Sequence, residues 1–432
     1  MSADRLSWGR FPRERAARVH SLHWPAEPLP RDASILARGC GSSYGDSCLN
    51  AGGTLVDTTR LDRLVAFDRG AGVVRCEAGV TLEALLEVIV PAGWFLPVTP
   101  GTRRVTVGGA VANDVHGKNH HRAGTFGAHV SALGLARSDG SRSVIAPGSD
   151  PARFAATVGG LGLTGLITWV ELALRPLVSS SLDVETVRFH GVDEFLALSS
   201  ESAERFEHTV AWVDTTARGA GFARGLFMRA NHAPRPGPLT ARARSRRLSI
   251  PFDFPAFALS RPTVRAFNAL HFGLGRAGRG TAHLEPFFYP LDAIGSWNRM
   301  YGRRGFVQHQ SVVPMAPARE AVTALLEAIT ASGEASFLSV LKVFGDRPSP
   351  GMLSFPRPGV TLALDFPMRG ERTLALLDRL DAIVMEAGGA IYPAKDARMS
   401  RETFRRSFPR LGEFVPHVDP AFSSSFWRRV HG

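Results

Sequence analysis

The sequence predicts an α+β fold built from two units, and three observations lead to this class. Over residues 1–175, short apolar runs alternate with glycine-rich turns, without the regular strand–helix rhythm of a doubly wound sheet. From about residue 182, strand-like runs interleave with helix-like segments, which indicates a sheet with helices on one face. The chain length of 432 residues also suffices for two or three domains of roughly 150 residues each.

In the first unit, each expected element follows from its own pattern. Strands are predicted where short apolar runs end at turn residues, at 34–38, 54–57, 73–77, 130–136 and 166–174. A helix is predicted over residues 81–90, between two of these runs.

The second unit combines longer helices with apolar strands. Its strands are predicted at residues 306–313, 337–344 and 360–366, and its helices at 319–331 and 371–387. Between the units, residues 231–247 combine prolines with five arginines and little apolar content. That composition is typical of a mobile basic loop.

Composition excludes several classes of protein. A hydrophobic content of 44% with 21% charged residues is ordinary for a globular chain and excludes a wholly disordered one. No apolar run approaches the ~20 residues of a membrane span, and the first residues lack the apolar core of a secretory signal. The cysteines Cys40, Cys48 and Cys76 have neither disulfide-framework nor zinc-ligand spacing. We therefore expect a protein of the reducing cytoplasm.

Lysine is the rarest charged residue of the chain. Of 51 basic residues only Lys118, Lys342 and Lys395 are lysines, and the other 48 are arginines. Where arginine fills the general basic positions, a remaining lysine is a candidate for chemistry that a guanidinium cannot perform. Chance placement of three lysines is the alternative.

Three glycine-rich segments, residues 37–46, 100–110 and 158–165, dominate the first unit. Glycine lets backbone amides turn toward an anion, and serine hydroxyls add donors. None of the segments is a Walker loop or a dinucleotide-binding fingerprint. Each alone could be a structural turn, but three in one unit favour a large phosphorylated cofactor.

The motifs in these segments resemble those of a known family. RGCGSSYGD (38–46), PGTRRVTVGGAVANDVHGKNHH (100–121) and ATVGGLGLTG (156–165) are similar to flavoenzymes of the vanillyl-alcohol-oxidase type. More narrowly, the chain resembles the decaprenylphosphoryl-β-D-ribose 2′-oxidase family. The similarity continues through PLDAIGSWNRMYGRRGFVQHQ (290–310) and is weakest over residues 231–280.

The resemblance implies a domain arrangement. It places a two-lobed FAD-binding domain of the PCMH type at residues 1–178 and an inserted substrate-binding domain at residues 179–390. The inserted domain is expected to contain an antiparallel sheet covered by helices. Residues 391–432 are expected to return to the FAD domain.

The resemblance also implies noncovalent FAD. Many related enzymes attach FAD to a histidine in the first loop, and here that position is Ser42, which lacks a nucleophilic nitrogen. The expected cofactor-binding residues are Arg38, Gly39, Cys40, Gly41, Ser42, Ser43, Tyr44, Pro100, Gly101, Thr102, Val105, Thr106, Gly108, Gly109, Ala112, Asn113, His116, Gly117, Gly162, Gly165, Ile167 and Tyr392.

Lys395 and His116 are the expected catalytic residues. Lys395 matches the active-site lysine of the family and could orient the hydroxyl or act as the base; both roles stay open. His116 is expected beside flavin and substrate, with a purely structural hydrogen bond as the alternative. A metal site at His116, His120 and His121 is disfavoured, since adjacent histidines diverge on a regular element, so no metal is expected.

The expected substrate-binding residues include both glutamines of the chain. They are Lys118, Gln308, Gln310, Lys342, Trp297, Tyr301, Phe288, Thr361 and Ala363. Gln308 and Gln310 share one face of a strand and need polar partners, either the substrate sugar or each other and the backbone. Lys342, inside an apolar run, needs an anion, either the substrate or a structural salt bridge.

The chain departs from the family in the pocket. Thr361 and Ala363 stand where members commonly have asparagine and cysteine, and Phe288 stands where a tyrosine is usual. These changes leave the flavin chemistry in place and put the identity of the sugar and its carrier in doubt.

The implied function is FAD-dependent oxidation of a secondary alcohol of a sugar by hydride transfer to flavin N5. The resemblance points to the 2′-hydroxyl of a polyprenylphosphoryl pentose, as the first half of an epimerisation that a separate keto-sugar reductase completes in cell-wall biosynthesis. The net charge of +12 fits an anionic lipid at the inner membrane surface. A flavin-dependent oxidase of a soluble nucleoside or glycoside is the alternative. A nucleic-acid-binding protein is disfavoured, because arginine outside residues 231–247 is dispersed and no nucleic-acid motif occurs.

Overall fold

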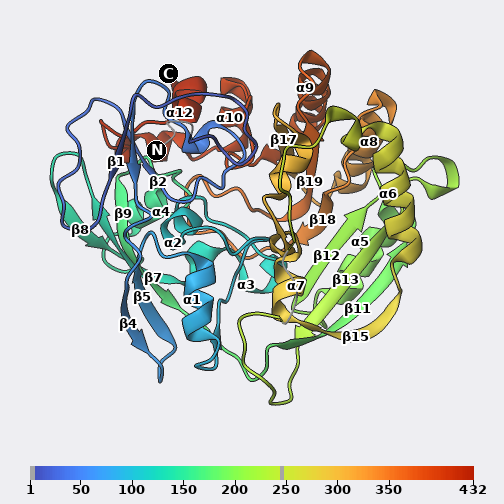
Figure 1. Ribbon diagram of the computed structural model, residues 1–432, viewed down its shortest axis with the longest axis horizontal. Coiled ribbons are helices and arrows are strands. Elements are labelled where there is room, and N and C mark those ends of the chain that lie inside the picture. Colours follow the sequence, from blue (N-terminus) through green and yellow to red (C-terminus); the bar gives the residue numbers. More distant parts are fainter. Residues whose placement is uncertain (1–4, 244–247) are drawn as a thin grey trace.

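The structure, a computed structural model, describes residues 5–243 and 248–432, arranged around two groups of sheets (Figure 1). The first group contains a three-stranded parallel sheet and a five-stranded antiparallel sheet of strand order β4-β5-β9-β7-β8. Its strands are β1 (Arg18–Ser21), β2 (Ile35–Arg38), β3 (Thr54–Asp57), β4 (Leu64–Asp68), β5 (Val73–Glu77), β7 (Val130–Ala136), β8 (Arg142–Ile145) and β9 (Leu166–Ala173). A two-stranded ladder joins β6 (Trp94–Phe95) to β10 (Arg175–Pro176).

Helix α1 (Leu82–Ile89) shows how this group acquires its core. Thr81 caps the helix by accepting a hydrogen bond from the amide of Ala84, and one face buries Leu82, Leu85, Leu86 and Ile89. The other helices of the group are α2 (Val107–Ala112), α3 (His120–Ala123) and α4 (Pro151–Thr157). Helix α3 lies between the two groups of sheets, and the chain then returns to β7 of the first group (Figure 1).

The second group is an eight-stranded sheet of order β15-β11-β13-β12-β18-β19-β17-β20, and every pair for which the register is defined is antiparallel. Its strands are β11 (Ser181–Phe189), β12 (His208–Val213), β13 (Gly225–His232), β15 (Gly278–His283), β17 (Phe306–Val313), β18 (Ser339–Phe344), β19 (Gly359–Pro367) and β20 (Ala390–Ile391). A further short ladder pairs β14 (Leu248–Ser249) with β16 (Ile294–Gly295).

Helices cover both faces of this sheet, so the expectation of one covered face is wrong. Helices α5 (Gly191–Ser202), α8 (Ala318–Ser332) and α9 (Glu371–Glu386) share a buried cluster with Ala211, Leu341 and Leu362. Helix α6 (Arg261–Leu274) packs on the opposite face, where His271 contacts the ring of Trp212. Adjacent residues of a strand point to opposite faces of the sheet, so Ala211 faces α5, α8 and α9 and Trp212 faces α6.

The C-terminal segment returns to the first group. Phe422 forms a parallel bridge with Ile35, and the amide of Ser425 donates to Leu49 O at 2.8 Å. The remaining helices are α7 (Leu284–Phe288), α10 (Arg401–Ser407), α11 (Leu411–Phe414) and α12 (Ser425–His431). Single 3-10 turns are η1 (Asp46–Cys48), η2 (Phe126–His129), η3 (Gly219–Gly221), η4 (Ala256–Leu259), η5 (Pro290–Ala293), η6 (Trp297–Tyr301) and η7 (Val415–His417).

All eight expected strands and all three expected helices are present, and most bounds agree within one residue. The largest difference is β18, which begins at Ser339 because residues 337–338 do not pair. In the expected basic loop, β13 extends to His232, residues 233–243 contain no helix or strand, and 244–247 lie outside the described residues. Within the described chain, no helix combines the length and apolarity that a bilayer crossing demands.

Candidate active site

The loop after β2 presents a row of backbone amides without acceptors. In the described structure, the N–H groups of Cys40, Gly41, Ser42 and Ser43 donate to no protein atom. Gly41 has φ +65°, a left-handed conformation that favours glycine. Ser42 Oγ donates to Arg104 O at 3.1 Å and thereby joins this loop to the second glycine segment. Successive free amides in such a turn form an anion-binding nest.

The second and third glycine segments converge on α2. A Cβ on Gly39 would lie 2.3 Å from Thr106 Oγ1, so only glycine lets the first two loops approach so closely. The amide of Leu161, in the third segment, donates to Ala112 O at 2.8 Å. Gly108 and Gly109, expected as anion donors, instead use their amides on Ala78 O and Thr106 Oγ1. The amides of Gly101 and Thr102 donate to no described protein atom, so the available donors are those of the first loop and of these two residues.

Other residues expected near the cofactor have mainly local roles. Arg38 is buried and donates to Leu6 O at 2.8 Å, which fixes the N-terminal segment. Val105 O and Asn113 O accept hydrogen bonds from Leu82 and Tyr392. Residues that shape the loops without a side-chain bond of their own are Pro100, Gly101, Gly162, Gly165 and Ile167.

His116 is the centre of a network that joins the two groups of sheets. Its Nδ1 lies 2.9 Å from Lys342 Nζ on β18, and its Nε2 lies 3.0 Å from Gln310 Nε2 on β17. Lys342 Nζ also donates to Gly117 O at 3.0 Å, and Gln310 reaches Thr361 Oγ1 at 3.4 Å. Burial, and then the charge of Lys342, holds the pKa of His116 well below its usual range. The imidazole is therefore neutral at pH 7 and accepts from Lys342.

Lys342 and Lys118 have no carboxylate partner among the described residues, which differs from the salt bridge considered for Lys342. Lys118 Nζ donates to Phe288 O at 3.1 Å and lies over aromatic rings. Burial lowers the pKa of Lys118 to about 8. Burial, and then the charges of Lys118 and Lys395, lowers the pKa of Lys342 to about 7. A buried ammonium without a counter-ion is costly, so this region is suited to an anionic ligand.

Lys395 lies opposite a buried carboxylate that sequence reasoning did not select, Asp365 on β19. Gln308 Nε2 donates to Asp365 Oδ1, and Lys395 Nζ lies 3.7 Å from the centroid of the Tyr44 ring. Burial raises the pKa of Asp365 to about 7, opposed by Gln308 and Lys395. Burial lowers the pKa of Lys395 to about 8, opposed by Asp365. These two groups therefore titrate in the physiological range and influence each other.

One hydroxyl near this pair has no partner. Tyr301 is buried, and its Oη has no hydrogen-bond partner among the described atoms. Its pKa is raised well above the usual value by burial and then by the charges of Asp365 and Tyr44. A buried unsatisfied hydroxyl is costly, so Tyr301 Oη is available to a ligand.

The aromatic residues predicted for the site have different positions. The Tyr392 ring stacks on Phe355 at 4.6 Å, and its hydroxyl donates to Asn113 O at 2.9 Å. Trp297 packs edge-on against Trp8 in a small core cluster. The Phe288 ring is buried in the hydrophobic core that contains α1, and both the ring and the carbonyl of Phe288 lie by Lys118 Nζ.

Asp365 could have been found from the strand pattern. Thr361, Ala363 and Asp365 alternate along β19 and share a face, and Asp365 pairs in register with Gln308. Asp114 was also missed; Ser354 Oγ and the amide of Gly127 donate to it, and burial raises its pKa to about 6. It supports the turn that carries His116 and does not reach the lysines directly.

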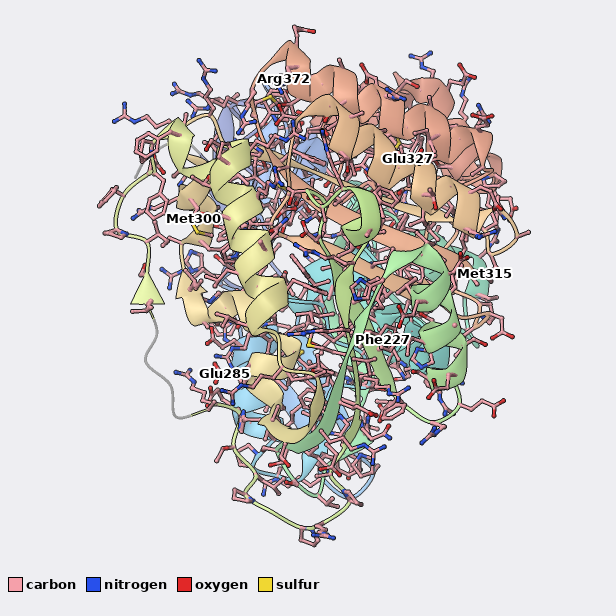
Figure 2. All side chains as sticks on the ribbon, turned by 90° about the vertical axis from the view of Figure 1, so that its right-hand side faces the viewer. Phe227, Glu285, Met300, Met315, Glu327 and Arg372 are labelled. Carbon is pink, nitrogen blue, oxygen red and sulfur yellow. The ribbon has the colours of Figure 1, made fainter. Side chains whose placement is uncertain are left out.

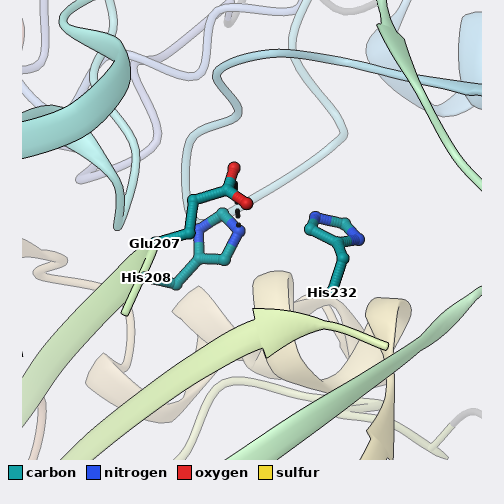
Figure 3. Close-up of side chains that lie close together, drawn as sticks. All are labelled: Glu207, His208 and His232. Atoms are coloured by element: carbon teal, nitrogen blue, oxygen red, sulfur yellow. Dashed lines mark ion pairs between the residues drawn. The ribbon is translucent and has the colours of Figure 1, made fainter. Parts of the chain in front are cut away.

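Figure 3 shows a separate cluster of possible metal ligands formed by Glu207, His208 and His232. Glu207, His208 and His232 bring ligand atoms within 4.8 Å of one another. His208 Nε2 lies 3.5 Å from Glu207 Oε1, and the ring nitrogens of both histidines have no hydrogen-bond partner among the described atoms. The carboxylate of Glu207, however, is held by the guanidinium of Arg175. Burial, His232 and Arg175 together hold the pKa of His208 well below its usual range. This positive surrounding opposes a bound cation.

Comparisons with known proteins agree with this geometry. Residues 29–146 match the FAD binding domain family. The chain is 36% identical over 412 residues to "Decaprenylphosphoryl-beta-D-ribose oxidase" of Mycolicibacterium smegmatis, covering 92% of this chain and 89% of the relative. It is also 36% identical over 376 residues to "Uncharacterized protein in mprA 5'region" of Streptomyces coelicolor, covering 81% of this chain and all of the relative. A "Putative D-arabinono-1,4-lactone oxidase" of Neurospora crassa is 26% identical over 34% of this chain and 26% of its own length.

The three converging glycine segments and the matched domain define the protein as an FAD-dependent oxidoreductase. The identity and coverage above are sufficient to assign a narrower group. The chain belongs to the decaprenylphosphoryl-β-D-ribose oxidase family.

Proposed function

We propose that this protein oxidises the 2′-hydroxyl of a polyprenylphosphoryl pentose. Three lysines converge on the site from separate elements, and two of them, Lys118 and Lys342, have no carboxylate partner among the described residues. This excess of buried positive charge is the observation that carries the proposal, because a phosphate on the substrate would supply the missing anion. The relative from M. smegmatis is named for a substrate of this kind.

The free amides of the first loop support a position for the cofactor. The nest at Cys40–Ser43 would hold the FAD pyrophosphate noncovalently, and Tyr392 and Asn113 would border the ring system. FAD, when bound, accepts a hydride from the carbon that bears the hydroxyl. Residues 1–178 and 391–432 would form the two-lobed cofactor domain, and residues 179–390 the substrate domain.

The residues of the chain would divide the remaining tasks. The ammonium of Lys395 stabilises the negative charge that develops during oxidation. Asp365 keeps Lys395 protonated, and Gln308 fixes the carboxylate. His116, neutral and with its two ring nitrogens engaged by Lys342 and Gln310, would position these two side chains at the substrate. Tyr301 Oη offers a hydrogen bond that no protein atom uses.

The partners of the reaction are also part of the proposal. Oxidation of a 2′-hydroxyl gives a keto sugar, so a separate reductase would complete the epimerisation. The net charge of +12 and the anionic lipid carrier suit peripheral association with the inner membrane surface.

A product assay tests the proposal. The purified flavoprotein would be mixed anaerobically with a short-chain prenylphosphoryl ribose, with free nucleosides and with simple glycosides, while the flavin absorbance is followed. We expect rapid flavin reduction by the prenylphosphoryl pentose alone and a 2′-keto sugar as product. Reduction by nucleosides or glycosides in its place would overturn the proposed substrate, and a colourless protein would overturn the flavin chemistry itself.

A further inference from the structure

Exposed apolar side chains are concentrated in one short part of the chain. Fifteen large apolar side chains are exposed in the described structure, and six of them come from residues 248–274. These six, which we call the docking face, are Leu248, Phe252, Phe257, Phe267, Leu270 and Leu274, with exposed fractions from 48% to 73%. Contiguous apolar surface of this kind marks an interaction site.

Helix α6 has an exposed apolar face, and its buried residues are Val264 and Asn268. Phe267, Leu270 and Leu274 recur at helical spacing on its outer face and are exposed. Its inner face buries the polar Asn268, whose Nδ2 donates to Asp214 Oδ1 at 3.0 Å and to Ser336 O at 3.2 Å. Viewed from the side in Figure 2, α6 (yellow) lies on the outside of the molecule with the β14 segment beside it. The apolar face therefore points away from the protein.

The charge around the docking face is positive, and this charge indicates the kind of partner that binds there. Residues 231–280 contain nine arginines and one acidic residue, Asp253, so this stretch carries eight of the twelve net positive charges. Asp253 is neutralised by Arg10 at 2.6 Å. Arg265 and Arg276 are exposed without an ion pair to any described residue. Apolar side chains among arginines match an anionic lipid surface, whereas a second copy of this chain would bring like charges together.

The docking face borders the active-site face of the eight-stranded sheet. Helix α6 packs on Trp212, and the register that pairs Ala211 with Leu341 places Trp212 beside Val340. Val340 pairs with Ala363, in the expected substrate pocket, and is itself exposed. Two strands therefore separate the apolar helix from the pocket.

We propose that the docking face inserts its apolar side chains into an anionic lipid bilayer and directs the pocket toward it. A lipid-linked substrate then passes from the bilayer past Val340 to the lysines without leaving the apolar phase. Entry of substrate by this route rests on the proposed function, whereas the bilayer contact does not.

Vesicle co-sedimentation of the holoprotein tests the bilayer contact. The vesicles would contain phosphatidylcholine alone or phosphatidylcholine with one third phosphatidylglycerol. We expect at least tenfold stronger binding to the anionic vesicles, weakened by salt. The double variant Leu270→Glu/Leu274→Glu should lose at least tenfold in binding. The matched control Val65→Glu/Val144→Glu, at exposed positions on β4 and β8, should bind as the wild type does.

The outcomes separate this proposal from the proposed function. Equal binding by the two double variants, or no binding by the wild type, overturns the docking face. Concentration-dependent self-association that only Leu270→Glu/Leu274→Glu abolishes would assign the face to a second copy and also overturn the proposal. A water-soluble short-chain prenylphosphoryl ribose should reduce the flavin of both variants at the wild-type rate. Failure of the wild type with that substrate would count against the proposed function alone.

Discussion

Burial and a nearby carboxylate shift the pKa of Lys395 in opposite directions. Burial lowers its pKa to about 8, and the charge of Asp365 limits that decrease. The Tyr44 ring, 3.7 Å from Nζ, adds a cation–π contact that also favours the charged form. Lys395 is therefore charged at pH 7. Because this pH is close to the pKa of Lys395, a small change in the surrounding charge would alter its protonation.

Substitution of Lys395 tests its role directly. Lys395→Ala should retain FAD and slow flavin reduction by at least ~100-fold, the usual effect of removing one preorganised donor. Lys395→Arg should be nearly as slow, since the planar guanidinium does not fit the position of the ammonium. Anaerobic stopped-flow reduction measures both rates. Near-normal rates in both variants, with flavin bound, would exclude Lys395 from the mechanism.

The pH profile distinguishes a charged Lys395 from a basic one. If the ammonium stabilises charge, reduction should slow as pH rises through the Lys395 pKa of about 8. Asp365→Asn removes the negative charge that raises this pKa, so the decline should move to lower pH. The control Asp62→Asn, at an acidic residue on the loop after β3, should leave the profile unchanged. A rate that instead increases through this range would identify Lys395 as the base.

At the scale of single elements, sequence patterns located much of the site. The three glycine segments and the three rare lysines, selected from the sequence, lie close together around α2 and His116, and their role as a site stays a prediction. The contacts between them were not predictable, because Gln310 and Lys342 are 194 and 226 residues from His116 in sequence. Sequence analysis did not select Asp365, although it alternates with Thr361 and Ala363 along β19, nor did it select the exposed apolar face of α6.

The loop after β2 makes the attachment of the cofactor testable. Ser42 replaces the linking histidine, and its hydroxyl is already bonded to Arg104 O. Acid or heat denaturation should therefore release all of the flavin into the supernatant. An absorbance spectrum of the supernatant and of the pellet measures the partition. Flavin remaining with the precipitated protein would show a covalent bond.

Strand β19 gives a prediction about thiol reagents. Ala363 lies on the site face, and the free cysteines Cys40, Cys48 and Cys76 lie elsewhere. Reagents that capture a pocket cysteine should therefore leave the activity of the Cys40→Ser background intact. Ala363→Cys in that background should be inactivated with one equivalent of label. Mass spectrometry and residual activity measure the outcome, and stoichiometric inactivation without the added cysteine would place Cys48 or Cys76 in the site.

At the scale of the whole molecule, the C-terminal helix α12 forms ion pairs with a residue near the N-terminus and with the loop that carries Lys395. Arg429 on α12 pairs with Asp46 at 2.7 Å and with Asp396 at 2.9 Å, and both carboxylates are about 4% exposed. Asp396 follows Lys395 directly, and its carboxylate accepts from the amides of Arg398 and Met399. The loop that carries Lys395 is therefore held in place through α12.

Removal of this guanidinium should affect both stability and the site. Arg429→Met leaves two buried carboxylates without a cation, which we expect to cost roughly 3 kcal/mol of the free energy of unfolding. It should also lower the rate of flavin reduction, because the Lys395 loop loses its anchor. Arg405→Met, at an exposed arginine on the nearby α10, is the control. Urea denaturation measures the first effect and stopped-flow reduction the second. Burial raises the pKa of Asp46, so without Arg429 this carboxyl takes up a proton more readily and the destabilisation should diminish at low pH. A loss equal at pH 5 and pH 8 would show that packing of the arginine stem dominates.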